Sequence, residues 1–125
     1  MKNKIQFVLV LLFGLLFINA GLNKLFNYIP VPPDLPEETL KDFGAMKEII
    51  WLMPLLAMSE IIGGLLIVIP KTRALGAIIV FPAMIGILLN HVLVDRSGLV
   101  MSVILLAILA WVMYDNREKY LPMIR

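Results

Sequence analysis

The sequence contains no cysteine and only one histidine in 125 residues. Without thiols the chain supplies no thiolate to an iron–sulfur cluster or a structural zinc ion, and it runs no disulfide exchange. A lone histidine does not provide both axial ligands of a bis-histidine haem. Nucleophile-elbow, P-loop and dinucleotide-binding motifs are also lacking. We therefore expect no metal, no covalent cofactor, no nucleic-acid partner and no enzyme that acts alone.

Charge is scarce as well: 16% of the residues are charged and 61% are hydrophobic. The mean hydropathy of +0.94 implies more apolar surface than a small soluble domain buries. Four apolar runs, over residues 5–26, 49–69, 74–94 and 98–114, are each near the ~20 residues that a helix needs to cross ~30 Å of hydrocarbon. The sequence thus predicts an all-α integral membrane protein, with residues 1–125 forming one antiparallel four-helix transmembrane domain.

The first apolar run also has features of a cleavable secretory signal. Lys2 and Lys4 precede it, and Ile18-Asn19-Ala20 is similar to a cleavage triplet. However, Ile18 is large for such a site and the run is long for a signal sequence. Cleavage would also leave an odd remainder of three spans. We therefore expect the first run to be a membrane span.

Basic residues in the connections predict the orientation. One side carries Lys2, Lys4, Lys71, Arg73, Arg117, Lys119 and Arg125, and the other carries Lys24, Lys41, Lys47 and Arg96. Cytoplasmic loops are enriched in lysine and arginine, so both termini are expected in the cytoplasm, across a bacterial inner membrane.

The outer loop, residues 27–48, begins with a proline-rich stretch that does not continue a helix. Pro36 followed by Glu37 and Glu38 is a helix-start signal. The spacing of Leu40, Phe43 and Met46 then predicts a short helix on the outer surface, lying against the bundle or the membrane interface.

Glu60 is the most unusual polar residue, because it lies ~15 Å from the outer end of its span, near the middle of the bilayer. An acidic residue there costs on the order of 2.5–3.5 kcal/mol, so it normally faces the bundle and has a partner. Helical side chains lean toward the helix N-terminus, which directs Lys24, Glu60 and His91 into the outer half of the bundle. Asn19 is expected to bridge the remaining gap, and Asn90 adjoins His91.

Each of these residues also has a structural explanation. Lys24 fits an interfacial anchor, and a protonated Glu60 fits a hydrogen bond to a neighbouring helix. His91 fits a packing role, whereas Asn19 and Asn90 fit hydrogen bonds between helices.

The segments FINAGLNKLFNY, MPLLAMSEIIGGLLIVIPKTRALGAI and LLNH together resemble the DoxX family of small four-span membrane proteins of bacteria and archaea. The matching positions are Gly21 with Lys24, Glu60 with Gly63 and Gly64, Thr72 with Arg73, and His91. The resemblance implies a link to quinone-dependent sulfur oxidation or to oxidative-stress assemblies, which some relatives have. It transfers no catalytic residue. The proline-rich outer loop and Asn23 differ from many relatives.

Two functions from different classes fit these residues. In the first, the chain is a non-catalytic subunit or binding module of a membrane redox system. It would hold a quinone-like molecule through Lys24, Glu60 and His91, and its partners would be the lipid bilayer, other membrane redox subunits or a second copy of the chain. In the second, Glu60 is the proton-coupling carboxylate of a small transporter. A purely structural scaffold is a third alternative.

Overall fold

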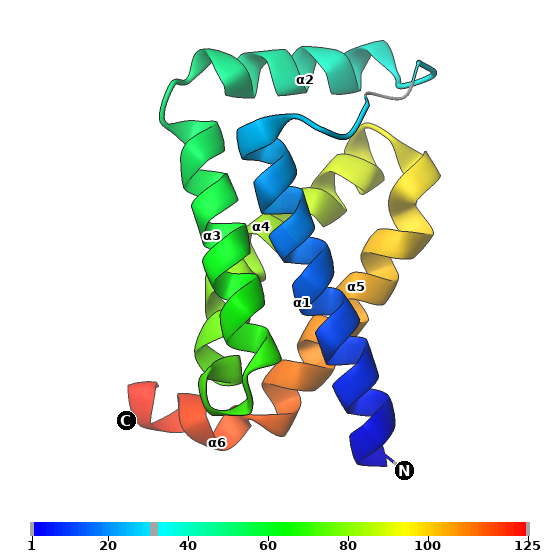
Figure 1. Ribbon diagram of the computed structural model, residues 1–125. Helices are drawn as coiled ribbons and strands as arrows, with labels where there is room; N and C mark the ends of the chain where they lie inside the picture. The colour runs from blue at the N-terminus through cyan, green and yellow to red at the C-terminus, as the bar shows by residue number, and fades with distance from the viewer. Residues whose placement is uncertain (1, 31–32, 125) are drawn as a thin grey trace.

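The computed structural model describes residues 2–30 and 33–124, and these fold almost entirely as helices, without a β-strand in that part of the chain (Figure 1). The α-helices are α1 (Lys2–Phe26), α2 (Glu37–Glu48), α3 (Leu52–Val68), α4 (Arg73–Leu93), α5 (Leu99–Asp115) and α6 (Arg117–Tyr120). Short 3-10 turns are η1 (Pro70–Thr72), η2 (Arg96–Gly98) and η3 (Leu121–Ile124). The all-α prediction is confirmed. Of the residues used in the sequence predictions, Val31, Pro32, Arg125 and the side chain of Lys2 lie outside the described part.

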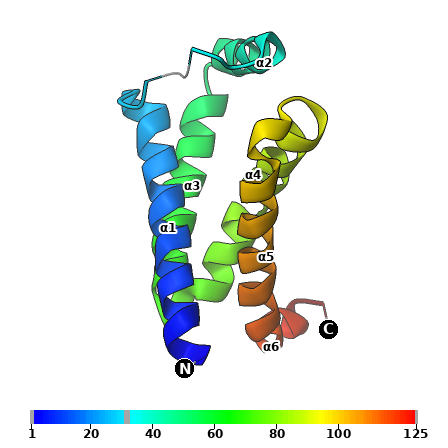
Figure 2. The ribbon, with the colours of Figure 1, turned by 90° about the vertical axis from the view of Figure 1, so that its right-hand side faces the viewer.

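The four long helices α1, α3, α4 and α5 run alternately up and down (Figure 1). Helix α1 packs along α3, α3 packs along α4, and α4 packs along α5. Figure 2 shows that α4 and α5 diverge from α1 and α3 toward the end covered by α2. The α1–α3 pair and the α4–α5 pair are therefore farther apart at the end that α2 covers.

Glycines explain the close approach of the helices. A Cβ atom at Gly64 would lie 2.7 Å from the carbonyl oxygen of Gly14, and one at Gly76 would lie 2.7 Å from that of Gly63. Side chains at these positions would push α1 from α3 and α4 from α3. These glycines are therefore the points at which the helices pack closest.

The core contains apolar side chains from all four long helices. Its buried members are Val10, Phe13, Phe17, Ile67, Ala77, Val80, Met84, Leu105, Leu109 and Val112. The rings of Phe13 and Phe17 stack at 4.8 Å between centroids. On the outside, large apolar residues such as Leu12, Leu55 and Val100 are exposed, which suits a surface in contact with lipid.

Among the described residues, three helical segments are long and apolar enough to cross a membrane: Lys4–Phe26, Pro70–Leu93 and Arg96–Asp115. A fourth crossing results if α2 and α3, which meet at a bend of 97°, count as one broken span. Helix α3 itself begins at Leu52, three residues after the predicted start of its apolar run, because Ile49–Trp51 form the bend. Its 17 residues extend ~26 Å, slightly less than the hydrocarbon thickness.

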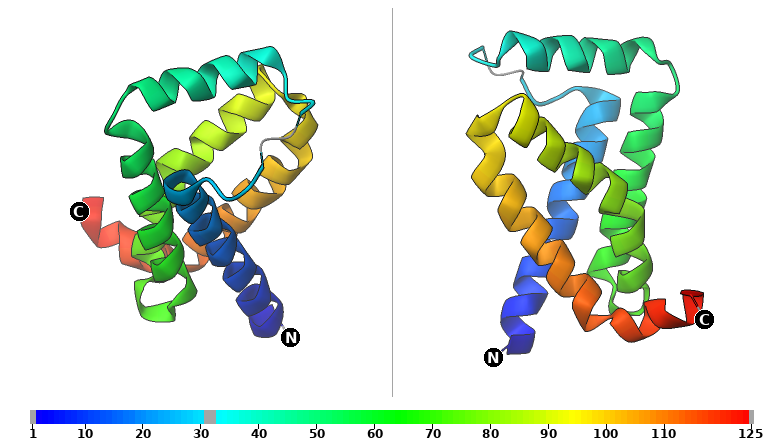
Figure 3. Two further views of the ribbon diagram at one scale, coloured as in Figure 1. Left: turned by 45° about the horizontal axis from the view of Figure 1, so that its top comes forward. Right: turned by 180° about the vertical axis from the view of Figure 1, so that it is seen from behind.

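Helix α2 lies across one end of the long helices (Figure 3). It begins directly after Pro36, where the sequence predicted a helix start, and it buries only Thr39. At the other end, α6 and η3 also turn aside, an element that the sequence analysis did not predict.

The turn between α3 and α4 is held by the Thr72-Arg73 pair. Arg73 Nε donates to the carbonyl oxygen of Ile67 at 2.8 Å, and Nη2 donates to that of Val68 at 3.2 Å. Thr72 Oγ1 donates to the carbonyl oxygen of Leu66 at 2.8 Å. These bonds satisfy carbonyl groups that the last turn of a helix leaves without partners.

Candidate functional site

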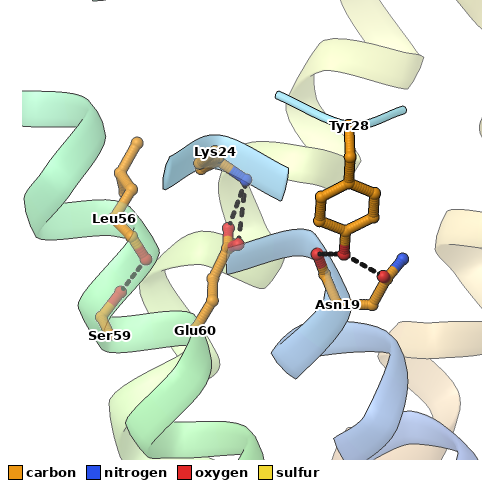
Figure 4. A network of polar contacts seen from close by, with 6 residues as sticks. All are labelled: Asn19, Lys24, Tyr28, Leu56, Ser59 and Glu60. Atoms are coloured by element: carbon orange, nitrogen blue, oxygen red, sulfur yellow. Dashed lines mark hydrogen bonds and ion pairs between the residues drawn. The ribbon is translucent and has the colours of Figure 1, made fainter. Parts of the chain in front are cut away.

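The centre of the candidate site is an ion pair between Lys24 of α1 and Glu60 of α3. Lys24 Nζ lies 2.9 Å from Oε1 and 2.9 Å from Oε2 of Glu60, so one amine donates to both carboxylate oxygens (Figure 4). Glu60 is 3% exposed, whereas the Lys24 side chain is 22% exposed. Glu60 is therefore almost inaccessible to solvent, whereas Lys24 reaches water or the cavity described below.

A close backbone contact brings these two residues together. A Cβ atom at Gly21 would lie 2.6 Å from the carbonyl oxygen of Ala57. Lys24 is three residues after Gly21 and Glu60 three residues after Ala57, on helices that run in opposite directions. Each side chain leans back toward the N-terminus of its helix, and hence toward the level of the contact. The presence of a lysine at the end of the apolar helix α1 is thus explained by Glu60, whose carboxylate that lysine bonds.

The geometry favours the partner role of Lys24 over the anchor role. An interfacial anchor directs its amine toward the membrane surface, but the amine of Lys24 bonds a carboxylate buried between helices. Leaving one member of such a pair alone typically costs about 3–5 kcal/mol, because a buried charge then has no counter-charge. Glu60, the more buried partner, therefore depends on Lys24 more than Lys24 depends on Glu60.

The pair borders a cavity of about 640 Å³ that lies beneath α2 and against α3 and α4. Its polar lining comes from Lys24, Asp42, Glu60, Asn90 and His91. The other lining residues are mostly apolar: Phe43, Met46, Leu52, Leu56, Pro82, Ala83, Gly86, Ile87, Leu89, Leu93 and Val94. A volume of this size with a few convergent polar groups is typical of small-molecule sites.

His91 lines the same cavity but is held by a different set of contacts. Its Nδ1 lies 2.8 Å from the backbone carbonyl oxygen of Asp95. A carbonyl oxygen only accepts hydrogen bonds, so Nδ1 carries a proton and donates it to this contact. Gly98 leaves room for the ring, since a Cβ atom there would lie 2.7 Å from Nδ1. His91 therefore shares the cavity with the ion pair and is oriented by the turn after α4.

Two acceptor groups organise the end of α4 near His91. The backbone carbonyl of Asn90 accepts from the amides of Val94 and Asp95, each at 2.9 Å. Asp95 Oδ1 in turn accepts from Ser97 Oγ at 2.7 Å and from the Ser97 amide at 3.1 Å. The hydrogen bonds from Ser97 hold the pKa of the Asp95 carboxyl below its usual range. These contacts hold the turn that follows α4, next to the part of the cavity wall that Asn90 lines.

Asn19 does not bridge Lys24 and Glu60 as the sequence analysis expected. Its side-chain oxygen accepts a hydrogen bond from the hydroxyl of Tyr28, and its backbone oxygen lies 3.0 Å from the same hydroxyl (Figure 4). The reason is helical rotation: five residues turn a helix by about 500°, which places Asn19 ~140° from Lys24 around α1. Asn19 therefore joins the exposed side of α1 to the start of the loop.

The part of α2 that closes the cavity was not predicted from the sequence. Asp42, Phe43 and Met46 line it from above, although this helix is distant in sequence from α4. The only signal was the spacing of Phe43 and Met46, which indicated an apolar face on that helix. In the part of the chain that the structure describes, no group of three or more metal-ligating side chains is arranged to hold a metal ion.

Comparison with known proteins adds one finding. The family model described as DoxX matches residues 6–94, well over half of the chain, and the matched region includes Lys24, Glu60 and His91. No curated protein and no solved structure matches the chain.

Proposed function

The chain belongs to the DoxX family and is a multi-pass membrane protein, and we propose that it is a non-catalytic, small-molecule-binding module of a membrane redox or oxidative-stress system. The ligand is a quinone-like molecule in the cavity beneath α2. The observation that carries the proposal is a largely apolar cavity of about 640 Å³ with a buried Lys24–Glu60 pair at its wall.

The chemistry of the cavity suits a flat apolar ligand with carbonyl oxygens. Lys24 has three N–H groups and directs two to Glu60, which leaves one donor for a ligand oxygen. The amide of Asn90 offers two further donors at another part of the wall. The side chains of Leu56, Pro82 and Ile87 supply apolar surface for the ring. Glu60 fixes the position of the donor amine.

The proposed setting is a bacterial inner membrane, with both termini in the cytoplasm and α2 on the outer face. The long helices α1, α3, α4 and α5 are then four antiparallel spans. The excess of basic residues at the end that holds both termini supports this orientation. Other membrane redox subunits, or a second copy of the chain, would exchange electrons or ligand with the module.

Filling the cavity tests the proposal. No atom lies within 4 Å of a Cβ atom at Gly86, a cavity-lining residue, so Gly86→Leu inserts a side chain without a backbone clash. Gly44→Leu is the matched control, because Gly44 has the same free space but does not line this cavity. We expect Gly86→Leu to weaken binding of a short-chain ubiquinone, measured by native mass spectrometry of the detergent-solubilised protein, by at least about tenfold.

The outcomes separate the alternatives. Equal quinone affinity in both leucine variants and the parent protein contradicts the proposed site. Uptake into proteoliposomes that requires a pH gradient and disappears in Glu60→Gln supports the transporter instead. A Glu60→Gln variant that is more stable and loses neither binding nor uptake supports a scaffold.

A further inference from the structure

A second surface of interest lies at the opposite end from the cavity, where α6 and η3 run across the ends of the long helices (Figures 1 and 3). Asn116 ends α5 by donating from its side-chain amide to the carbonyl oxygen of Val112 at 2.7 Å. The hydroxyl of Tyr120 then donates to the carbonyl oxygen of Ala74 at 2.8 Å. This bond ties the C-terminal segment to the first turn of α4.

The segment combines exposed apolar and basic side chains. Met123 is 67% exposed and Ile124 is 83% exposed, and Lys119 is exposed beside the Tyr120 contact. Lys71 of η1, three residues before Ala74, is exposed as well. We call Lys71, Lys119, Met123 and Ile124 the C-terminal face.

Charge at this end is predominantly positive. The described basic side chains are Lys4, Lys71, Arg73, Arg117 and Lys119, and the acidic ones are Asp115 and Glu118. Several of these are already engaged. Arg73 caps α3, Arg117 lies over the ring of Tyr114 at 4.3 Å from the centroid, and Asp115 accepts a hydrogen bond from Gln6. Lys4, Lys71 and Lys119 are the exposed lysines among the described residues of this end, and Lys71 and Lys119 are the two that lie on either side of the Tyr120–Ala74 contact in sequence.

The α2 end has the opposite balance of charge, with more acidic than basic residues. The basic residues are Lys24, Lys41, Lys47 and Arg96, and the acidic residues are Asp34, Glu37, Glu38, Asp42, Glu48, Glu60 and Asp95. Anionic headgroups are therefore attracted to one end of the molecule and repelled from the other. Such asymmetry in a membrane protein places the basic end at an anionic leaflet.

We propose that the C-terminal face binds the headgroups of anionic phospholipids. Lys71 and Lys119 contact the phosphate groups from two sides of the Tyr120–Ala74 hydrogen bond. Met123 and Ile124 enter the boundary between headgroups and acyl chains, as the apolar side chains of interfacial segments do. Helix α6 and the turn that follows it lie across the axes of the long helices, which keeps this segment near one membrane depth (Figure 1). This surface does not depend on the quinone-like ligand proposed above.

The test uses the full chain in detergent micelles, titrated with short-chain phosphatidylglycerol or phosphatidylcholine and followed by native mass spectrometry. The variant is Lys71→Gln/Lys119→Gln, and the matched control is Lys41→Gln/Lys47→Gln, two exposed lysines of α2. Each lysine near a charged lipid surface contributes about fivefold in affinity, which is ~1 kcal/mol. We expect the variant to lose about 25-fold of the preference for phosphatidylglycerol and the control to keep it.

Three results would overturn the proposal. The parent protein binds both lipids equally, the two double variants lose the preference to the same degree, or inorganic phosphate alone displaces the bound phosphatidylglycerol. A Met123→Ser/Ile124→Ser variant adds an independent measurement. We expect this variant to bind both lipids more weakly, by a similar factor, because the substitutions remove apolar contact and leave the charges in place.

Discussion

Replacing Lys24 by methionine removes the cation that lies 2.9 Å from both carboxylate oxygens of Glu60. Methionine keeps most of the apolar length of the side chain, so the change concerns the charge more than the packing. The carboxylate of Glu60 is 3% exposed and is left with no counter-charge from Lys24. Loss of one partner of a buried pair costs about 3–5 kcal/mol in the free energy of unfolding.

Replacing Glu60 by glutamine is expected to cost less. The Lys24 side chain is 22% exposed and is at the end of α1, so its amine still reaches solvent when the carboxylate is gone. A loss of about 1.5–3 kcal/mol is the usual effect of removing a hydrogen bond to a charged group. In the double variant neither charge is left unpaired, and the expected total loss is ~2 kcal/mol. The two single losses together exceed the loss in the double variant by at least about 2.5 kcal/mol, which is the expected coupling between the two sites.

The free energies are measured by titrating sodium dodecyl sulfate into protein in dodecyl maltoside micelles and following the helix signal by circular dichroism. Lys47→Met/Glu48→Gln is the control cycle, because both residues are exposed on α2 and the structure records no ion pair between them. We expect its coupling to be below about 0.5 kcal/mol. Additivity of Lys24→Met and Glu60→Gln within that same margin would refute the argument that the pair carries the stability of this site.

Three further contacts are tested by substitution. Gly64→Ala should lower the free energy of unfolding by about 1–3 kcal/mol, because its Cβ would lie 2.7 Å from the Gly14 carbonyl oxygen. A Cβ atom at Gly86 meets no atom within 4 Å outside its own stretch of helix, so Gly86→Ala should instead raise the free energy of unfolding by up to about 1 kcal/mol. Arg73→Gln should cost about 1–3 kcal/mol in the same detergent titration, since it frees the carbonyl oxygens that end α3; an unchanged midpoint would contradict the capping role. Burial raises the pKa of the Tyr120 phenol above its ordinary value of 10.0. The contribution of the protonated phenol to the free energy of unfolding is therefore complete below about pH 10 and is lost as the pH rises through the raised pKa. The free energy of unfolding, measured from about pH 8 to about pH 11, should fall more steeply in the parent protein than in Tyr120→Phe.

Local sequence was sufficient for the helices themselves. Hydropathy over ~20 residues indicated the apolar helices, because a backbone in hydrocarbon must satisfy its own hydrogen bonds. Pro36 with Glu37 and Glu38 indicated where α2 begins, because proline suits the first turn and acidic groups suit its exposed amides. The convergence of Lys24 and Glu60 also followed from the sequence. The depth of each residue in the membrane and the tilt of its side chain toward the helix N-terminus depend only on its position along the helix and on the direction of that helix.

Two features depended on the tertiary structure: the direction that each side chain takes around its helix axis, and the packing of segments that are distant in sequence. Asn19 is at a suitable depth but faces away from Glu60, and His91 is held by the turn after α4 and makes no ion pair. The cavity exists because α2 folds back over α3 and α4, through a 97° bend that no local pattern specified. The depth of a residue in the membrane follows from its position along the chain. The direction that a side chain takes around its helix axis, and the closing of the cavity, depend on which helices pack together, and glycines decide where two backbones come into contact. The sequence alone therefore determined which polar groups lie in the apolar part of the molecule, and the folded structure decided which of them share a cavity.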